Sequence, residues 1–322
     1  ALEINIDSAT TSNIASTAFA SPLGASQPSQ TLMDLAMTGP SGLVSLGAAI
    51  AIVNYTPRTT AAITSGGSLT SSGPVNVTTT TNHNVGTTAD ASSATAVNAD
   101  ASAIATSNLV VTDEAYVGAN GVNVNVATPE LNVRTVTDGG ADQTTTEARS
   151  GSGGLNNVNT LVINGGQMGA YALSTELRRS DAYLADGSTL TLPNGNTNVH
   201  LDVQSDYVQD TTAEPDGVAS IAGTLGTGRS YAGTLGAHTN RAVVGLNDLG
   251  LPGNSGVTVV GAGNLEVTAS ANSLNRTTAY SGALAGVAAD TESAATVAAT
   301  NSTLAMIGTG SNLNLGGAAL VE

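Results

Sequence analysis

A short alternating phrase recurs along this chain of 322 residues, and this internal repeat constrains the fold more than any other feature. Each copy places two aliphatic residues on one face of a strand, with Asn, Asp or Glu between them, as a period of two requires. The copies begin at Ile4, Val75, Leu131, Leu201, Leu265 and Leu313. We therefore interpret residues 1–322 as one domain of about four to five degenerate repeats of roughly 64 residues.

A second phrase, which combines Ala with a turn Gly, precedes each new strand. "DEAYVG" ends at Gly118 and "TLAMIG" ends at Gly308, so that Ala115 matches Ala305. Related stretches end at Ile63, Gly187 and Gly245. Such low identity between the copies is expected where the structure requires only a small residue, an inward aliphatic residue and a Gly for the turn.

Composition selects among the repeat architectures. Aromatic residues make up 2% of the chain, so the interior must be thin and lined by small aliphatic groups. Helical solenoids require a 3.6-residue apolar stripe, and propeller blades require recurring aromatic signatures; the chain has neither. Short strands, polar turns and stacked small residues favour an all-β fold, a parallel β-helix (β-solenoid).

The repeat length also predicts dimensions. If each repeat forms about three coils, the chain makes on the order of 15 coils and a rod roughly 70 Å long, with unpaired strand edges at both ends. Three stretches rich in Gly, Pro and Asp predict loop insertions that leave the coils. They are residues 22–37, 210–217 and 246–256.

Charge and cysteine content exclude several functional classes. The net charge of -16 arises from 24 acidic residues against eight Arg, and such a field repels nucleic acid and anionic membranes. The chain has no Cys, which excludes a disulfide framework. The longest apolar run, residues 43–53, is too short to be a transmembrane segment. Because Ala1 is not an initiator Met, we expect a processed product or a piece of a longer chain.

Candidate catalytic residues are few. Parallel β-helices can carry paired carboxylates that cleave glycosidic bonds, and the candidates are Asp202 with Asp206, or Asp113 with Glu114. Asp202 alternates with Leu201 and Val203, which indicates a solvated outer face.

Histidine and arginine chemistry is equally sparse. His83, His200 and His238 lie far apart in the sequence, and we interpret the surroundings of His83 and His200 as turns. Arg178 and Arg179 form a basic doublet that we expect to pair with Glu176 and Asp181.

Calcium is the one cofactor that the sequence suggests. The stretches "DGGAD" and "DTTAEPDG" bring hard oxygen ligands together in turns, although neither is an EF-hand loop, and an ordinary Asx turn is the alternative interpretation. The candidate ligands are Asp138, Asp142, Asp210, Glu214 and Asp216. No other cofactor is expected.

The order and spacing of the phrases in residues 75–126, with "VNV" at Val75 and "AYVG" around Tyr116, resemble those of a known family. It is similar to the repeats of large secreted bacterial filamentous adhesins of the leukotoxin and filamentous-haemagglutinin types. The resemblance implies a surface-exposed or extracellular structural protein, a stiff and adhesive rod that is not an enzyme. Its partners would be flanking repeats or other copies end to end, and host or cell-surface glycans or proteins.

Two other functions remain open at this stage. The chain could be a self-assembling subunit that stacks end to end into a filament. Alternatively, it could be a carbohydrate-active β-helix enzyme, which would need an acidic cluster on one coil face against long insertions. A structural segment would instead carry uniform polar faces along its length.

Overall fold

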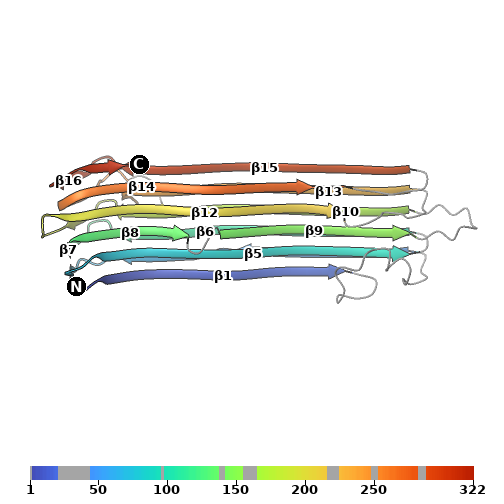
Figure 1. Cartoon of the computed structure of the whole chain (residues 1–322), viewed down its shortest axis with the longest axis horizontal. Helices are drawn as coiled ribbons and strands as arrows, with labels where there is room; N and C mark the ends of the chain where they lie inside the picture. Colours follow the sequence, from blue (N-terminus) through green and yellow to red (C-terminus); the bar gives the residue numbers. More distant parts are fainter. Residues whose placement is uncertain are drawn as a thin grey trace, which may run out of the picture.

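A computed structural model describes residues 2–20, 44–95, 98–137, 142–154, 165–215, 225–247, 253–281 and 288–322. Within these ranges the protein is all-β, and its strands belong to two sheets (Figure 1). Sheet A has eleven strands: β1 (Ile4–Ala20), β4 (Ser68–Thr70), β5 (Val75–Thr95), β7 (Asn123–Ala127), β8 (Glu130–Thr137), β9 (Asp142–Gly154), β11 (Thr189–Thr191), β12 (Thr197–Pro215), β14 (Thr258–Ala279), β16 (Asn312–Leu315) and β17 (Ala319–Val321). Sheet B has six: β2 (Val44–Tyr55), β3 (Arg58–Ile63), β6 (Asn98–Val117), β10 (Gly165–Ala185), β13 (Leu225–Leu246) and β15 (Ala288–Ile307).

All pairings between these strands are parallel, which confirms the all-β class and the parallel sheets expected from the sequence. The chain alternates between the sheets: β5 lies in sheet A and β6 in sheet B, the short strand β7 returns to sheet A, and β8 then lies beside β5. We call one passage through a long strand of each sheet a circuit. Successive circuits stack from β1 at the bottom of Figure 1 to β15 at the top.

The expected dimensions are wrong because one repeat of roughly 64 residues makes one circuit rather than three. The small-residue segment and the Ala phrase that follows it form one continuous strand, as in β6, which is 20 residues long. Such a strand is roughly 66 Å long, whereas five stacked strands rise only about 24 Å. The long axis in Figure 1 is therefore the strand direction and not the stacking direction.

The register confirms one sequence phrase and corrects the other. Ala61, Ala115, Ala182, Ala242 and Ala305 lie side by side across sheet B, so the match between "DEAYVG" and "TLAMIG" is real. In sheet A, Ile4, Val75, Leu131 and Leu265 share one row, as expected, but Val199 joins them and not Leu201.

The final repeat start was also misplaced. Leu313 pairs with Val259, in a row of short strands, whereas Ala319 is the partner of Leu265. A period of two explains both errors, because an alternating aliphatic phrase looks the same when it is shifted by two residues or moved to another alternating strand.

A column of glycines forms one corner of every complete circuit. Gly121, Gly187, Gly256 and Gly310 all have positive φ, between 71° and 78°. The Gly121 N–H donates to the Gly187 carbonyl at 3.1 Å, and the Gly187 N–H donates to that of Gly256 at 2.7 Å. A Cβ atom on Gly256 would lie 2.2 Å from the backbone of Gly310, so this corner accepts no side chain.

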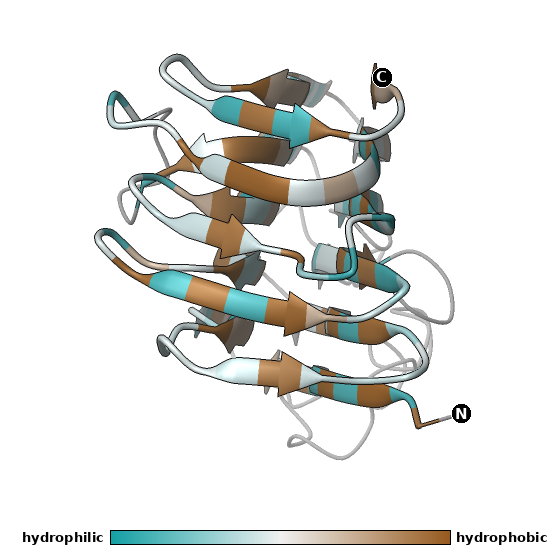
Figure 2. Ribbon diagram, turned by 90° about the vertical axis from the view of Figure 1, so that its left-hand side faces the viewer, coloured by the Kyte–Doolittle hydropathy of each residue, from teal (hydrophilic) through white to brown (hydrophobic). Residues whose placement is uncertain are grey.

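The space between the two sheets is divided along the strands into three zones. The aliphatic zone contains Val and Leu from the start of the long strands of sheet A and Ala, Val and Leu from the ends of those of sheet B, including Val75, Leu131, Leu201 and Leu184. The alanine zone, at the opposite end, contains Ala89, Ala103, Ala148, Ala172 and Ala213. A polar zone with buried charges separates them. Figure 2 shows the alternation of hydrophobic and hydrophilic residues along the strands.

Several expected loops lie elsewhere or cannot be placed. Residues 210–215 are not an insertion, because they continue strand β12. Residues 22–37 lie outside the described residues, as do 216–217 and 248–252. His83 and His200 lie within strands β5 and β12 and not in turns, because the long strands run through positions where the sequence suggested breaks.

Both ends of the stack are open in the described part of the chain. β15 pairs with β13 alone, and most of its residues are exposed. β1 pairs with β5 alone at the opposite end. Among the described residues, no helix has the length and apolar character needed to cross a membrane.

Candidate functional site

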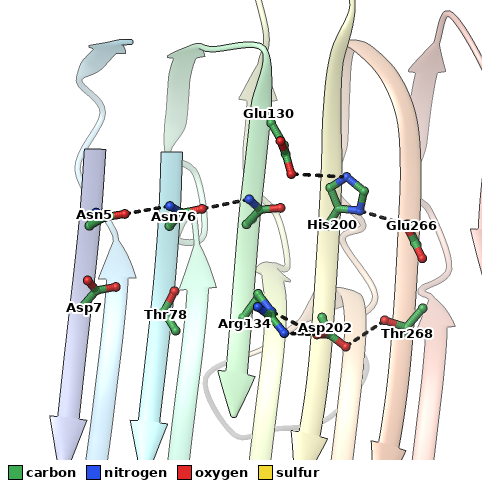
Figure 3. A pocket seen from close by; sticks show the side chains of 11 residues that line it. Asn5, Asp7, Asn76, Thr78, Glu130, Arg134, His200, Asp202, Glu266 and Thr268 are labelled. Atoms are coloured by element: carbon green, nitrogen blue, oxygen red, sulfur yellow. Dashed lines mark hydrogen bonds and ion pairs between the residues drawn. The ribbon is translucent and has the colours of Figure 1, made fainter. Parts of the chain in front are cut away.

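Two neighbouring rows of polar side chains cross the outer face of sheet A and line a groove of ≈ 670 Å³ (Figure 3). We call this surface the polar groove. Its first row consists of Asn5, Asn76, Asn132, His200 and Glu266, and its second row of Asp7, Thr78, Arg134, Asp202 and Thr268. Each row takes one residue from each circuit, because equivalent outward positions of parallel strands lie side by side.

Asparagine amides form a ladder across the first circuits. The Nδ2 of Asn76 donates to the Oδ1 of Asn5 at 2.7 Å, and the Nδ2 of Asn132 donates to the Oδ1 of Asn76 at 2.8 Å. Each amide has both a donor and an acceptor, so identical side chains can satisfy one another in a column. The ladder therefore links β1, β5 and β8 through their outward side chains.

Charged groups of the last circuits are already paired with one another. His200 Nδ1 lies 2.9 Å from Glu266 Oε2, and its Nε2 lies 3.9 Å from Glu130 Oε1. Arg134 Nη2 lies 3.0 Å from Asp202 Oδ2. The other carboxylate oxygen of Asp202, Oδ1, accepts a hydrogen bond from Thr268 at 3.0 Å. The groove thus combines the carboxylates of Asp7, Glu130, Asp202 and Glu266 with the guanidinium of Arg134, so its lining is polar and mainly acidic.

Neither carboxylate pair considered for glycoside cleavage has a suitable arrangement. Asp202 and Asp206 face outward on β12, as predicted for Asp202, but four residues of extended strand separate their Cα atoms by about 13 Å. Glycosidase carboxylates are about 5 to 9.5 Å apart. Asp113 and Glu114 are buried, with at most 2% exposure.

A buried ionic cluster occupies the polar zone. Arg178, on β10, has 1% side-chain exposure and contacts three carboxylates. Its Nε lies 3.1 Å from Glu176 Oε1. Its Nη1 forms an ion pair with Asp142 and lies 3.9 Å from Asp113 Oδ2. Its guanidinium also lies 4.9 Å from the ring centre of Tyr207. Arg178 therefore joins β6 and β10 of sheet B to β9 of sheet A.

Burial shifts the proton affinities in this cluster. Burial raises the pKa of Asp113 to about 6, although the nearby Arg178 opposes the rise. Burial lowers the pKa of His83, which the carboxylate of Asp142 only partly offsets. For Arg178, burial alone would lower the pKa, but Glu176, Asp142 and Asp113 together raise it.

A second ionic group lies beside the first. Arg241 on β13 donates two hydrogen bonds to Asp181 on β10, at 2.8 and 2.7 Å, and Arg179 Nε lies 3.0 Å from Asp181. Burial raises the pKa of Asp181, and Arg241 opposes the rise most strongly. Glu114 pairs with Arg58 at 2.8 Å and also with Arg179.

The expected pairing of Arg178 with Glu176 and of Arg179 with Asp181 is confirmed. Sequence reasoning missed that most of these groups are buried and that Asp142, Asp113 and Arg241 complete them. One sequence signal for this burial was present. Every second residue of β10 from Ala170 through Ala172 and Ser174 faces the interior, and Glu176 and Arg178 continue this alternation.

The residues suggested for calcium do not form one group in the described part of the chain. Asp142 points inward and binds Arg178, whereas Asp210 is partly exposed and lies 3.7 Å from Arg276. Glu214 follows on β12. Asp138 and Asp216 lie outside the described residues. No group of three or more His, Asp or Glu that could hold a metal occurs within the described ranges, so calcium at these loops stays a prediction.

Comparison with known proteins found no match to any protein-family model, curated protein or solved structure.

Proposed function

We propose that this chain is a β-solenoid that serves as a stiff structural segment of a bacterial surface-exposed or extracellular filament. The observation that carries the proposal is the parallel pairing that continues through five successive strand positions in each sheet, with local register shifts at Leu184/Ala185 and Thr197/Val199. The likeness of the repeat phrases to filamentous adhesins supports the location and an adhesive role.

Stiffness would come from features that recur in every circuit. Backbone hydrogen bonds run along the stacking axis in both sheets, and the alanine row from Ala61 to Ala305 continues from strand to strand. Each circuit adds only about 4.8 Å to that axis, so the five circuits here would extend a filament by about 24 Å. A long spacer then needs many such circuits, from flanking repeats or from further copies.

The open edges favour a self-assembling subunit as the second candidate. At one end β15 and the part of β14 beyond its pairing with β16 and β17 present parallel strands, and at the other end β1 and β2 present strands of the same polarity. Such edges can pair head to tail by translation along the stack, which generates an open filament rather than a closed ring.

Electron microscopy and fibre diffraction across a concentration series separate these two candidates. Stacked subunits predict filaments about 66 Å wide with a meridional reflection near 4.8 Å and an axial repeat near 24 Å. Short particles at every concentration favour a segment that needs covalent flanking repeats.

A tandem chain with two copies joined end to end tests the structural proposal itself. A rod-like segment predicts one continuous body of about twice the stacking height in solution scattering. Two separately tumbling bodies would contradict the proposal, because the circuits would then not continue across the junction.

We also propose that the chain is not an enzyme and that the polar groove is the surface to test for glycan or protein contacts. The wide spacing of Asp202 and Asp206 and the burial of Asp113 and Glu114 support this. Release of reducing ends from a panel of polysaccharides, lost in an Asp202→Asn variant, would contradict it.

A further inference from the structure

The outer face of sheet B carries large apolar side chains where its inner face carries alanines. In β2, Ala49 and Ala51 face the interior, whereas Ile50 and Ile52 face outward with 59% and 56% exposure. The central strands repeat this inversion: Ile104 on β6 and Tyr171 and Leu173 on β10 point outward and are 40% to 42% exposed. We call this surface the apolar face.

Three consecutive outward rows of the apolar face contain no residue that is charged at neutral pH. They are Ile50, Ile104, Tyr171, Tyr231 and Ala294; Ile52, Thr106, Leu173, Gly233 and Thr296; and Asn54, Asn108, Thr175, Leu235 and Ala298. The chain as a whole carries a net charge of -16, and the polar groove on the outer face of sheet A contains Asp, Glu, His and Arg. Charge is therefore absent from this surface while it is abundant elsewhere.

Strands with apolar residues on both faces are typical of parallel sheets that are covered on both sides. A contiguous apolar surface of this kind on a soluble protein marks an interaction site. We propose that the apolar face is an interface, and that it packs against the same face of a second copy of this chain. This pairing joins two stacks side by side and does not depend on the proposed end-to-end function.

The relief of the apolar face suits a second sheet. A Cβ atom on Gly169 would lie 3.1 Å from the ring of Tyr171, and one on Gly233 would lie 3.1 Å from Leu173. These side chains therefore lean over the glycines, and together with Ile104 and Tyr231 they line a shallow hollow of ≈ 420 Å³ that side chains of a facing sheet can fill. The rings of Tyr171 and Tyr231 stack at 5.2 Å and continue the flat row across two circuits. Flat sheets pack face to face about 10 Å apart through such side chains.

The area and the charge distribution favour a second copy as the occupant. The apolar face extends about 24 Å across five strands and about 20 Å along them, which is on the order of 500 Å² for each copy. A symmetric pair would bury on the order of 1,000 Å², at the lower limit for a specific interface. Charged residues begin at the border, where Glu292 lies 3.7 Å from Arg229 and also interacts with Tyr231, as in the polar rim of an interface.

Sedimentation equilibrium of the full chain tests the proposal with matched variants. We expect dimers that an Ile104→Glu/Leu173→Glu variant weakens on the order of 100-fold, because four carboxylates would be buried in the interface. Val260→Glu makes the same kind of change on the outer face of sheet A and should leave dimerisation unchanged. Monomers at every concentration, or dimers that both variants affect equally, would overturn the proposal.

Single spin labels distinguish side-by-side pairing from end-to-end stacking in the unperturbed dimer. The chain has no native Cys, so Thr106→Cys on the apolar face and Thr78→Cys on sheet A each give one label site. Face pairing predicts distances below about 30 Å from residue 106 and beyond about 40 Å from residue 78. End-to-end stacking predicts a distance of about 24 Å between the two labels at either site. That result would rule out pairing through the apolar face, and so would long label-to-label distances at both sites.

Discussion

The aliphatic zone and the polar zone are built from the same strands but are held together in different ways. On β5, Val75 and Val77 face the aliphatic zone, and only six residues further on His83 faces the polar zone. In the aliphatic zone any side chain of similar shape can stack on its neighbour. In the polar zone each charge requires a particular partner, from the same strand, from the facing sheet or from a neighbouring circuit.

The difference shows where the specificity of the stack resides. Aliphatic packing is non-directional and gives most of the favourable free energy of folding. It tolerates a shift by two residues, since Leu, Val and Ile alternate along each strand. A shift by two residues would move Arg178 away from Asp142 and Asp113, and buried unpaired charges are strongly unfavourable. The polar zone therefore selects one register among several that the aliphatic zone would accept.

The largest expected effect comes from removing the central cation. Arg178→Met leaves Asp142, Glu176 and Asp113 buried without their common partner, and should lower the free energy of unfolding by about 4 kcal/mol. Urea unfolding measures this change. Arg149→Met is the control, because Arg149 pairs with Glu147 at a 43% exposed site and its loss should cost less than about 1 kcal/mol. Equal losses of free energy of unfolding in the two variants would show that the buried ion pairs of the polar zone contribute no more to stability than an exposed pair.

A cavity in the aliphatic zone should be nearly as costly. Leu201 is fully buried in this zone, and Leu201→Ala should reduce stability by about 3 kcal/mol. The same urea experiment measures the loss. Because the circuits stack closely, we expect a single cooperative transition in this variant, and a separate early transition would contradict the view of one continuous interior.

The pH dependence of stability should distinguish the two zones next. The pKa of Asp113 rises from 3.8 to about 6 on folding, so between these values the native state holds a proton that the unfolded state releases. The stabilisation from protonated Asp113 is therefore fully present below about pH 4 and is lost as the pH rises to about 6. Over this range the free energy of unfolding should fall by about 2 to 3 kcal/mol.

Comparison with Asp113→Asn isolates this contribution. The variant should lack that part of the slope, whereas the opposite slope from His83, whose lowered pKa favours the native state as the pH rises toward 6.5, should remain. Chemical unfolding at half-unit intervals from pH 4 to 7 measures both curves. Parallel curves would mean that Asp113 does not hold its proton in the folded protein.

The smallest effect is expected on the outside. Asn76→Ala interrupts the amide ladder between Asn5 and Asn132, where water can replace the lost partners, and should cost about 1 kcal/mol. The melting temperature should fall by a few degrees, since a loss of this size changes little in a chain of this length. A loss as large as that of Leu201→Ala would place register control in the polar groove and not in the polar zone.

The candidate site could be predicted only in part. The outward position of Asp202 followed from its alternation with Leu201 and Val203, and the pairing of Arg178 with Glu176 followed from their separation by two residues. The contacts between Arg134 and Asp202 and between His200 and Glu266 join residues that are 68 and 66 apart, and no local pattern indicates them.

By itself the sequence determined the strand class, the parallel stacking and the register of sheet B. The reason is that Ala115 and Ala305 occupy an inward position where only a small residue fits, followed by glycines at the corner. The tertiary structure alone decided that one repeat makes a single circuit, because strand length depends on the facing sheet and not on local phrases. It also decided which carboxylates surround Arg178, since Asp142 and Asp113 reach it only when three strands from two sheets are in register.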